Sequence, residues 1–187
     1  MKPRRRGIIL IAAAALLWSS GGIGIKTVDE APLTVSFYRS LFAAIALFIL
    51  FGPKVWARRS WSSTTAFAAA IISYGACLVT FVVATKWTTA ANAIFLQYAG
   101  VVWVLLFAPI VIREPMRIKD AIAIAFAVVG MALFFVGKFE ARGMSGNLMA
   151  LLSSAFFAAL ILALRFENNA AESAITWGNL ALALALL

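Results

Sequence analysis

The sequence of this 187-residue chain predicts an all-α fold, in the form of a polytopic transmembrane helix bundle. Hydrophobic residues make up 64% of the chain and charged residues 12%, whereas about 25% of residues are charged in a typical soluble domain. The mean hydropathy is +1.00. Long apolar stretches recur along the chain, and the charged residues gather between them. Because almost no polar segment is left over, the function has to be built from membrane helices.

Seven apolar stretches follow one another along the chain. A helix needs about 20 apolar residues to cross a bilayer core about 30 Å thick, and the first six stretches have roughly this length. Five of these six contain no charged residue, and the second contains only Arg39. The seventh has reached 15 residues where the sequence stops. The stretches are residues 7–25, 33–51, 66–85, 88–112, 121–137, 143–164 and 173–187.

The connections between these stretches are short. Pro32 stands at the start of the second stretch, a position that proline favours in helices. Residues 86–87 form nearly the whole link between the third and fourth stretches. Glu114 and Pro115 precede the fifth stretch and are predicted to shape that turn, with the carboxylate near the helix N-terminus. Neighbouring spans are therefore expected to lie antiparallel.

The basic residues are distributed unequally between the two sides of the predicted bundle. With connections assigned to alternate sides, four lie opposite the N-terminus: Lys26, Lys86, Lys138 and Arg142. Eleven lie on the side of the N-terminus, namely Lys2, Arg4, Arg5, Arg6, Lys54, Arg58, Arg59, Arg113, Arg117, Lys119 and Arg165. Positive charge stays on the cytoplasmic side during insertion, so the N-terminus is predicted to be cytoplasmic, in a bacterial inner membrane. The net charge of +9 is thus a topology signal, and no nucleic-acid partner is expected.

The sequence also carries a weak internal repeat. A shift of 139 residues lays residues 7–48 on residues 146–187 without a gap, so that Trp18 meets Phe157 and Ala44 meets Ala183. An odd number of spans separates the two copies, so the second copy is expected to be inserted upside down. Residues 1–140 are then a first repeat of five helices, and residues 141–187 are the incomplete start of a second, inverted repeat.

The sequence offers little material for catalysis or metal binding. It has no histidine and a single cysteine, Cys77, in the third stretch. The acidic residues lie in loops or at helix ends: Asp29, Glu30, Glu114, Asp120, Glu140, Glu167 and Glu172. A nucleophile–base pair, a metal site and an intramembrane proton carrier each need groups that the stretches do not hold. We therefore predict a protein that is not an enzyme and that uses no metal and no cofactor.

Neutral polar and aromatic side chains are the candidates for a binding site. The fourth stretch carries Asn92, Gln97, Tyr98 and Trp103 on several faces, and the first carries Trp18. A helix with polar groups on several faces has little surface left for lipid, so the fourth span is predicted at the bundle centre. These five residues are predicted to line a substrate cavity. The alternative for each is hydrogen bonding and packing between helices.

Arg39 is the one charged residue inside a predicted span, six residues from its start and so about 9 Å along the helix. It is assigned a structural or gating role, together with Glu114 and Pro115. The favoured interpretation is that the Arg39 side chain snorkels to the outer interface. The alternative is a role in contacting substrate or in gating.

Several short motifs occur in a fixed order along the chain. They are Leu16-Leu17-Trp18-Ser19-Ser20 ahead of Lys26, Phe37-Tyr38-Arg39-Ser40-Leu41, the run of residues 86–93, Glu114-Pro115 followed by Asp120 and Gly130, and Gly146-Asn147-Leu148. In order and spacing the chain resembles the EamA-type members of the drug/metabolite transporter superfamily. The resemblance extends over the whole sequence.

The resemblance implies a carrier of ten helices in two inverted repeats, which moves small metabolites by alternating access. On this interpretation the chain is the N-terminal part of a protein of roughly 280 residues, in the bilayer as a homodimer or with its missing C-terminal repeat. We expect a secondary carrier, acting as an exporter, for neutral, zwitterionic or amphipathic solutes. A phosphorylated solute would require several cationic groups inside the bundle, and only Arg39 qualifies. The alternative is a membrane assembly or regulatory subunit that transports nothing.

Overall fold

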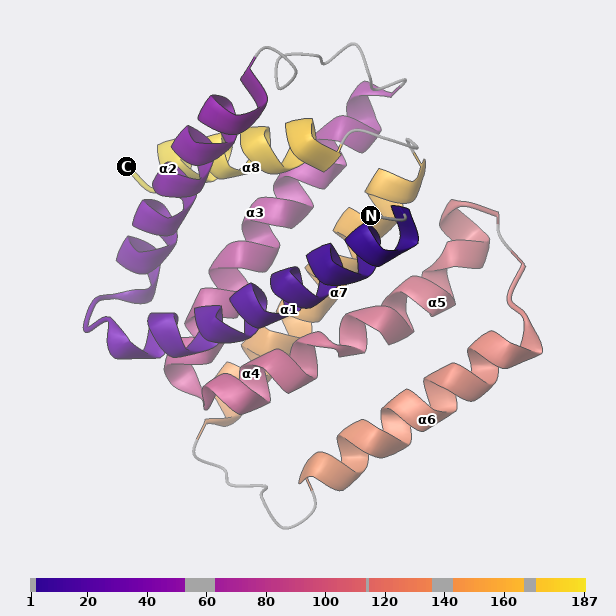
Figure 1. The fold of residues 1–187 in the computed structure, drawn as a ribbon. Helices are drawn as coiled ribbons and strands as arrows, with labels where there is room; N and C mark the ends of the chain where they lie inside the picture. Colours follow the sequence, from indigo (N-terminus) through magenta and orange to yellow (C-terminus); the bar gives the residue numbers. More distant parts are fainter. Residues whose placement is uncertain (1–2, 53–62, 114, 136–142, 167–170) are drawn as a thin grey trace.

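A computed structural model describes residues 3–52, 63–113, 115–135, 143–166 and 171–187. Over these ranges the chain forms eight α-helices and no β-strand, which confirms the predicted all-α polytopic bundle (Figure 1). The helices are α1 (Pro3–Thr27), α2 (Pro32–Phe51), α3 (Thr64–Trp87), α4 (Ala90–Gln97), α5 (Ala99–Val111), α6 (Ile118–Phe135), α7 (Met144–Phe166) and α8 (Ala171–Ala185).

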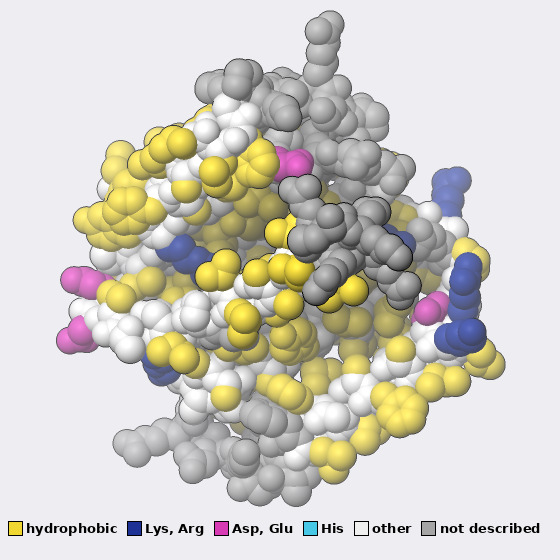
Figure 2. Space-filling model, viewed as in Figure 1, with side chains coloured by type: hydrophobic (Ala, Val, Ile, Leu, Met, Phe, Trp, Pro, Cys, Tyr) yellow, Lys and Arg dark blue, Asp and Glu magenta, His cyan; other side chains and the backbone are white. Residues whose placement is uncertain are grey.

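Five segments of the described chain are long and apolar enough to cross a bilayer. They are Gly7–Thr27, Pro32–Phe51, Thr64–Trp87, Ala90–Val111 and Met144–Phe166. Large apolar side chains stand on the outside of the bundle, and Figure 2 shows them over much of the visible face. Several of the fully buried side chains, by contrast, carry small hydroxyl groups, such as Ser36, Ser40, Ser153 and Ser154. This inside-out pattern is what a bundle in lipid requires, because lipid tails solvate apolar side chains as well as the interior does.

The two helices at the centre of the bundle are α3 and α7, which pack along most of their lengths. Helices α4 and α5 also pack on α7, whereas α2 and α8 pack together and on α3. Small residues allow the close approach. A Cβ atom added to Gly146 of α7 would lie 2.6 Å from the backbone nitrogen of Thr88, and one added to Gly178 of α8 would lie 2.6 Å from the Tyr74 ring.

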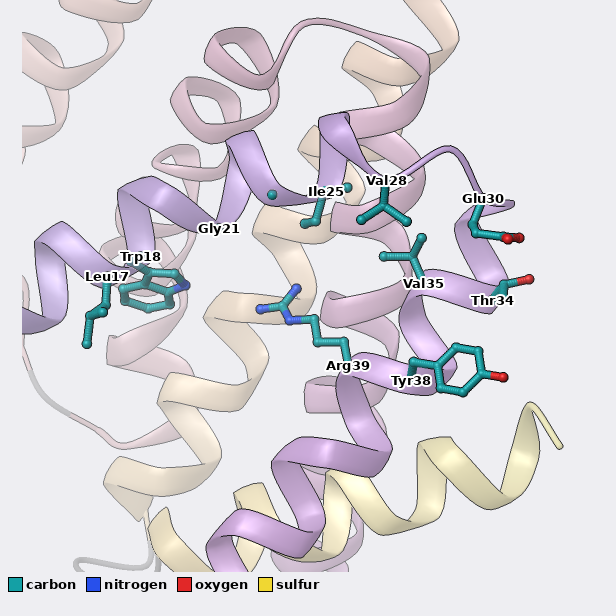
Figure 3. A pocket seen from close by; sticks show the side chains of 11 residues that line it. Leu17, Trp18, Gly21, Ile25, Val28, Glu30, Thr34, Val35, Tyr38 and Arg39 are labelled. Carbon is teal, nitrogen blue, oxygen red and sulfur yellow. The ribbon is translucent and has the colours of Figure 1, made fainter.

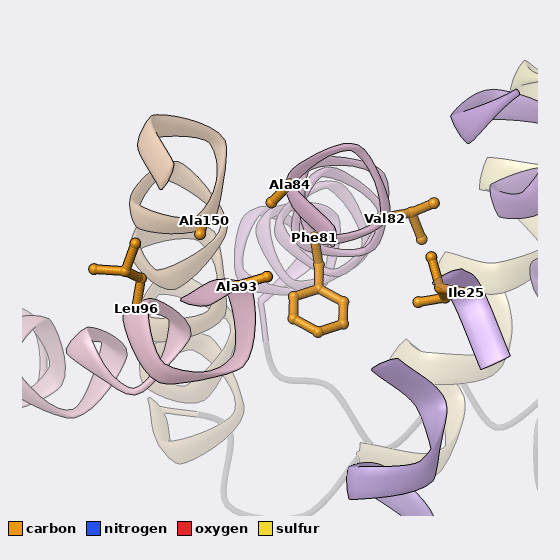
Figure 4. Close-up of a cluster of buried hydrophobic side chains, with 7 residues drawn as sticks. All are labelled: Ile25, Phe81, Val82, Ala84, Ala93, Leu96 and Ala150. Carbon is orange, nitrogen blue, oxygen red and sulfur yellow. The ribbon is translucent and has the colours of Figure 1, made fainter. Parts of the chain in front are cut away.

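A buried apolar cluster joins α1, α3, α4 and α7 at one end of the bundle (Figure 4). Phe81 is its largest side chain, and Ile25, Val82, Leu96 and Ala150 are among the others. Two lysines link the same helix ends from outside. Lys26 Nζ donates to the Lys86 carbonyl over 3.2 Å, and Lys86 Nζ donates to the Val28 carbonyl. Cations at helix C-termini satisfy carbonyl groups that the helices leave unpaired.

The fourth predicted span is interrupted at Tyr98, where α4 ends and α5 begins. The N–H of Tyr98 donates to the Phe95 carbonyl, and the N–H of Val101 donates to the Tyr98 carbonyl. These bonds span three residues, so the helix tightens locally. Gly100, a poor helix former, lies two residues after Tyr98. The predicted fourth span is confirmed as the apolar segment Ala90–Val111, in which Gln97 and Tyr98 stand at the junction of α4 and α5.

Candidate functional site

Trp18 stands between two adjoining pockets inside the described bundle. The larger, about 560 Å³, lies between α1 and α2 and is lined by Trp18, Ile25, Val35 and Arg39, among others (Figure 3). The smaller, about 150 Å³, lies between α1, α3, α4 and α7, and its lining includes Trp18, Gln97 and Tyr98. Three of the five predicted cavity residues are therefore brought together. The indole is 61% exposed and lines both pockets.

Gln97 connects the smaller pocket to a buried polar cluster. Its Nε2 donates to Ser153 Oγ over 3.3 Å and lies 3.5 Å from Cys77 Sγ. Ser153 Oγ in turn donates to the Cys77 carbonyl over 3.0 Å. The amide thus ties α4 to α3 and α7 at the point where the fourth span is broken. A carboxamide held in this way keeps its orientation, which a polar group must do if it is to select a solute.

Arg39 projects from α2 towards α1 and lines the larger pocket (Figure 3). Its Nη1 is buried and has no hydrogen-bond partner. The guanidinium is close enough to Tyr74 and Cys77 of α3 to interact electrostatically with both. The side chain extends toward α1 with Nη1 buried (Figure 3), and its snorkelling to the outer interface stays a prediction.

Tyr74 and Asn179 form a further polar pair inside the bundle, and the sequence did not point to them as site residues. Asn179 Nδ2 donates to Tyr74 Oη over 2.9 Å and to the Ile175 carbonyl over 2.8 Å. Asn179 Oδ1 is buried without a partner. Both are neutral polar residues inside apolar stretches, which is the signal that could have pointed to them.

The two other predicted cavity residues lie elsewhere. Asn92 Nδ2 donates to Thr88 Oγ1 over 3.3 Å, and Thr88 Oγ1 donates to Asn147 Oδ1 over 2.8 Å, so that this group joins α4 to α7. Trp103 Nε1 donates to Ser154 Oγ over 3.0 Å. The Trp103 ring faces a separate, apolar groove of about 580 Å³ between α3, α5 and α7. Within the described residues neither side chain lines the pockets beside Trp18.

A sequence model of the EamA-like transporter family matches residues 5–136 of the chain. The chain belongs to the EamA-like transporter family. Together with the apolar helices, this membership establishes an integral membrane protein, a transporter that moves a small solute across the lipid bilayer. No curated protein and no solved structure gives a significant match to the chain.

The region that matches the EamA-like family holds Trp18, Arg39 and Gln97, but several of their partners lie beyond it. Ser153 and Phe157 come from α7, after the matched residues. The Trp18 and Phe157 rings contact each other edge to face. The larger pocket of this EamA-like transporter is lined by the matched segment, and the smaller one is built jointly by that segment and α7.

Of the predicted turn between the fourth and fifth spans, Glu114 lies outside the described residues. Pro115 lies three residues ahead of α6 and lines a third pocket, together with Arg117, Asp120 and Arg165. Asp120 Oδ2 accepts a hydrogen bond of 2.8 Å from the Arg117 N–H, which satisfies a donor at the start of α6. Among the described residues no group of three His, Cys, Asp or Glu side chains is placed to hold a metal ion.

Proposed function

We propose that this EamA-like transporter is a secondary carrier that exports small neutral, zwitterionic or amphipathic solutes by alternating access. The supporting observation is the position of Trp18 between two pockets that share its indole as a wall. Apolar and aromatic groups dominate the lining, and a few fixed polar groups are added to it. That mixture is typical of sites for small organic molecules. We assign Trp18, Gln97 and Tyr98 to solute contact, and Asn92 and Trp103 to helix packing.

The proposed mechanism rests on an inverted repeat. A shift of 139 residues aligns three pairs with similar properties in the structure: Trp18 with Phe157, Ser40 with Asn179 and Ala44 with Ala183. The first pair is in ring contact. The members of the second pair each hold a buried polar atom without a partner, and those of the third are both buried while α2 packs on α8. Contact between equivalent residues is expected close to a two-fold axis, where two repeats can rock against each other.

The orientation follows from charge. Lys26 and Lys86 hold neighbouring helix ends together on the side with few cations, which we propose is external. The N-terminus would then be cytoplasmic, in a bacterial inner membrane. The carrier would act as a homodimer of the chain, and the mass of the purified complex in detergent, measured by light scattering, distinguishes this arrangement from a monomer.

Transport by the purified protein in proteoliposomes tests the proposal. We expect saturable uptake, accelerated by unlabelled solute on the opposite side, for at least one of radiolabelled mannitol, leucine and 3-phenylpropionate. Protein-free liposomes and liposomes with heat-denatured protein serve as controls. Flux equal to these controls for every solute class would contradict the carrier and favour an assembly or regulatory subunit. Export is tested by comparing flux in the two directions after the orientation of the protein has been measured.

A further inference from the structure

The Arg39 side chain is an unpaired cation at the wall of the larger pocket. Its Nη1 is buried and has no hydrogen-bond partner, and no acidic side chain in the described part of the chain forms an ion pair with it. Glu30 also lines the pocket, but it is exposed and its carboxylate points away from Arg39 (Figure 3). A guanidinium inside a membrane bundle is costly unless an anion or several acceptors satisfy it.

The wall opposite Arg39 is apolar. Leu17, Trp18 and Ile25 of α1, together with Val28 and Val35, form most of the lining, and Gly21 and Gly24 leave room between them. The volume of about 560 Å³ is in the range that small organic ligands occupy. A ligand that satisfies both parts of this pocket has an anionic head and an apolar body.

We propose that Arg39 binds the carboxylate of the transported solute, whose apolar part lies against Trp18 and the aliphatic side chains of α1. This inference rests on the proposed carrier function and narrows its solute class to amphipathic or zwitterionic monocarboxylates. One guanidinium matches one negative charge, and its planar donor fork fits the two oxygens of a carboxylate. A phosphate monoester would bring more negative charge than the single cation of the pocket can balance.

A competing occupant of the same position is water. Arg39 Nη1 is a donor without an acceptor, and Asn179 Oδ1 is an acceptor without a donor. A buried water that accepts from Nη1 would satisfy the guanidinium, as buried waters commonly do for unpaired polar groups. Water would satisfy the guanidinium regardless of solute, so in that case carboxylate and amide ligands would bind equally well.

Binding to the purified full chain in detergent, measured by calorimetry, separates these occupants. The probes are butyrate, hexanoate and 3-phenylpropionate, each paired with its carboxamide, and phenyl phosphate as a further anion. We expect at least one acid to bind at least tenfold more tightly than its amide and more tightly than phenyl phosphate. In Arg39→Met the affinity for the acid divided by the affinity for its amide should fall to about one, while the affinity for the amide itself changes less than twofold. Arg39→Lys should give an intermediate ratio, because it retains the charge but lacks the fork.

Lys119→Met is the matched control, because it removes one exposed cation on α6 and should leave the ratio unchanged. Circular dichroism of each variant shows whether it is folded, and Arg39→Lys keeps the test informative if Arg39→Met does not fold. The inference is overturned if no acid binds more tightly than its amide, or if Arg39→Met still prefers the acid to the same extent. Binding that shows the ratio without any flux in proteoliposomes would overturn the carrier function instead. Flux of a solute without any preference for carboxylates would leave the carrier standing and overturn the role of Arg39.

Discussion

The rings of Trp18 and Phe157 meet edge to face, with centroids 5.9 Å apart and planes inclined at 76°. An edge-to-face pair of this geometry is stabilising beyond the area that it buries. Trp18 comes from α1 and Phe157 from α7, and the two positions are aligned when the chain is shifted by 139 residues. The contact therefore links the start of the first proposed repeat to the start of the second, at the wall of the smaller pocket.

Trp18→Ala should reduce solute flux at least tenfold, because it removes the wall shared by both pockets and the contact with Phe157. Trp18→Phe should retain most of the flux. Thermal stability should stay close to that of the wild type, since the indole is 61% exposed. Trp87→Ala is the matched control, because Trp87 is also exposed, at 52%, but lines neither pocket. Flux is measured in proteoliposomes, and normal flux in Trp18→Ala would contradict the assignment.

Gln97→Ala should impair flux more than it impairs folding. The amide lies at the α4–α5 break and donates to Ser153, so its loss should change the shape of the smaller pocket. Trp103→Ala should instead lower the melting temperature, because it removes the hydrogen bond to Ser154 and an aromatic side chain between helices. Flux per folded molecule and thermal unfolding are measured for both variants. If the loss of flux in Gln97→Ala follows the loss of folded protein, Gln97 is a packing residue.

Gly146→Ala should destabilise the bundle, by about 1–3 kcal/mol for overpacking less about 1 kcal/mol gained in helix propensity. The added Cβ would lie 2.6 Å from the backbone nitrogen of Thr88, where α7 approaches the end of α3. Gly130→Ala in α6 is the control, because nothing lies within 4 Å of its added Cβ. Thermal unfolding followed by circular dichroism should place Gly146→Ala below the wild type and Gly130→Ala at or above it. Equal melting temperatures would show that α7 can move away from Thr88.

Cysteines placed at Arg58 and at Arg142 should react from opposite sides of the membrane. The unequal distribution of Lys and Arg assigns the first loop to the cytoplasm and the second to the exterior. The experiment uses a Cys77→Ala background, since Cys77 is the only cysteine in the sequence. Reaction with a membrane-impermeant maleimide is measured in intact cells and in inverted vesicles. Labelling of both positions from the same side would contradict the proposed orientation.

Five of the seven apolar stretches are confirmed as candidate spans, because an uninterrupted apolar run of membrane length has few other structures available to it. The sequence did not predict the tightened turn at Tyr98, where α4 meets α5 without a proline or a charged residue. Residue types also could not show which neighbours Asn92 and Trp103 meet. Their partners Thr88 and Ser154 were as compatible with a cavity as with a packed interface.

The direction of Arg39 was the most consequential feature that the sequence left open. A long cationic side chain some 9 Å inside a span can reach the surface, and most do. Here it extends toward α1, at a pocket between α1 and α2 (Figure 3). That pocket forms only when these two helices pack together.

The position of Arg39 within α2 also bears on how the protein is made. When α2 leaves the translocon, its guanidinium faces neither Tyr74 nor a pocket, and an arginine in mid-span opposes insertion by about 2.5–3.5 kcal/mol. Helix α2 holds ten leucine, isoleucine and phenylalanine residues, each favouring insertion by about 0.3–0.6 kcal/mol. Together these ten residues favour insertion by only modestly more free energy than the arginine opposes it. Polar substitutions on the lipid-facing side of α2, such as Ile49→Asn, should therefore reduce the membrane insertion of α2 more than they reduce the stability of the assembled transporter.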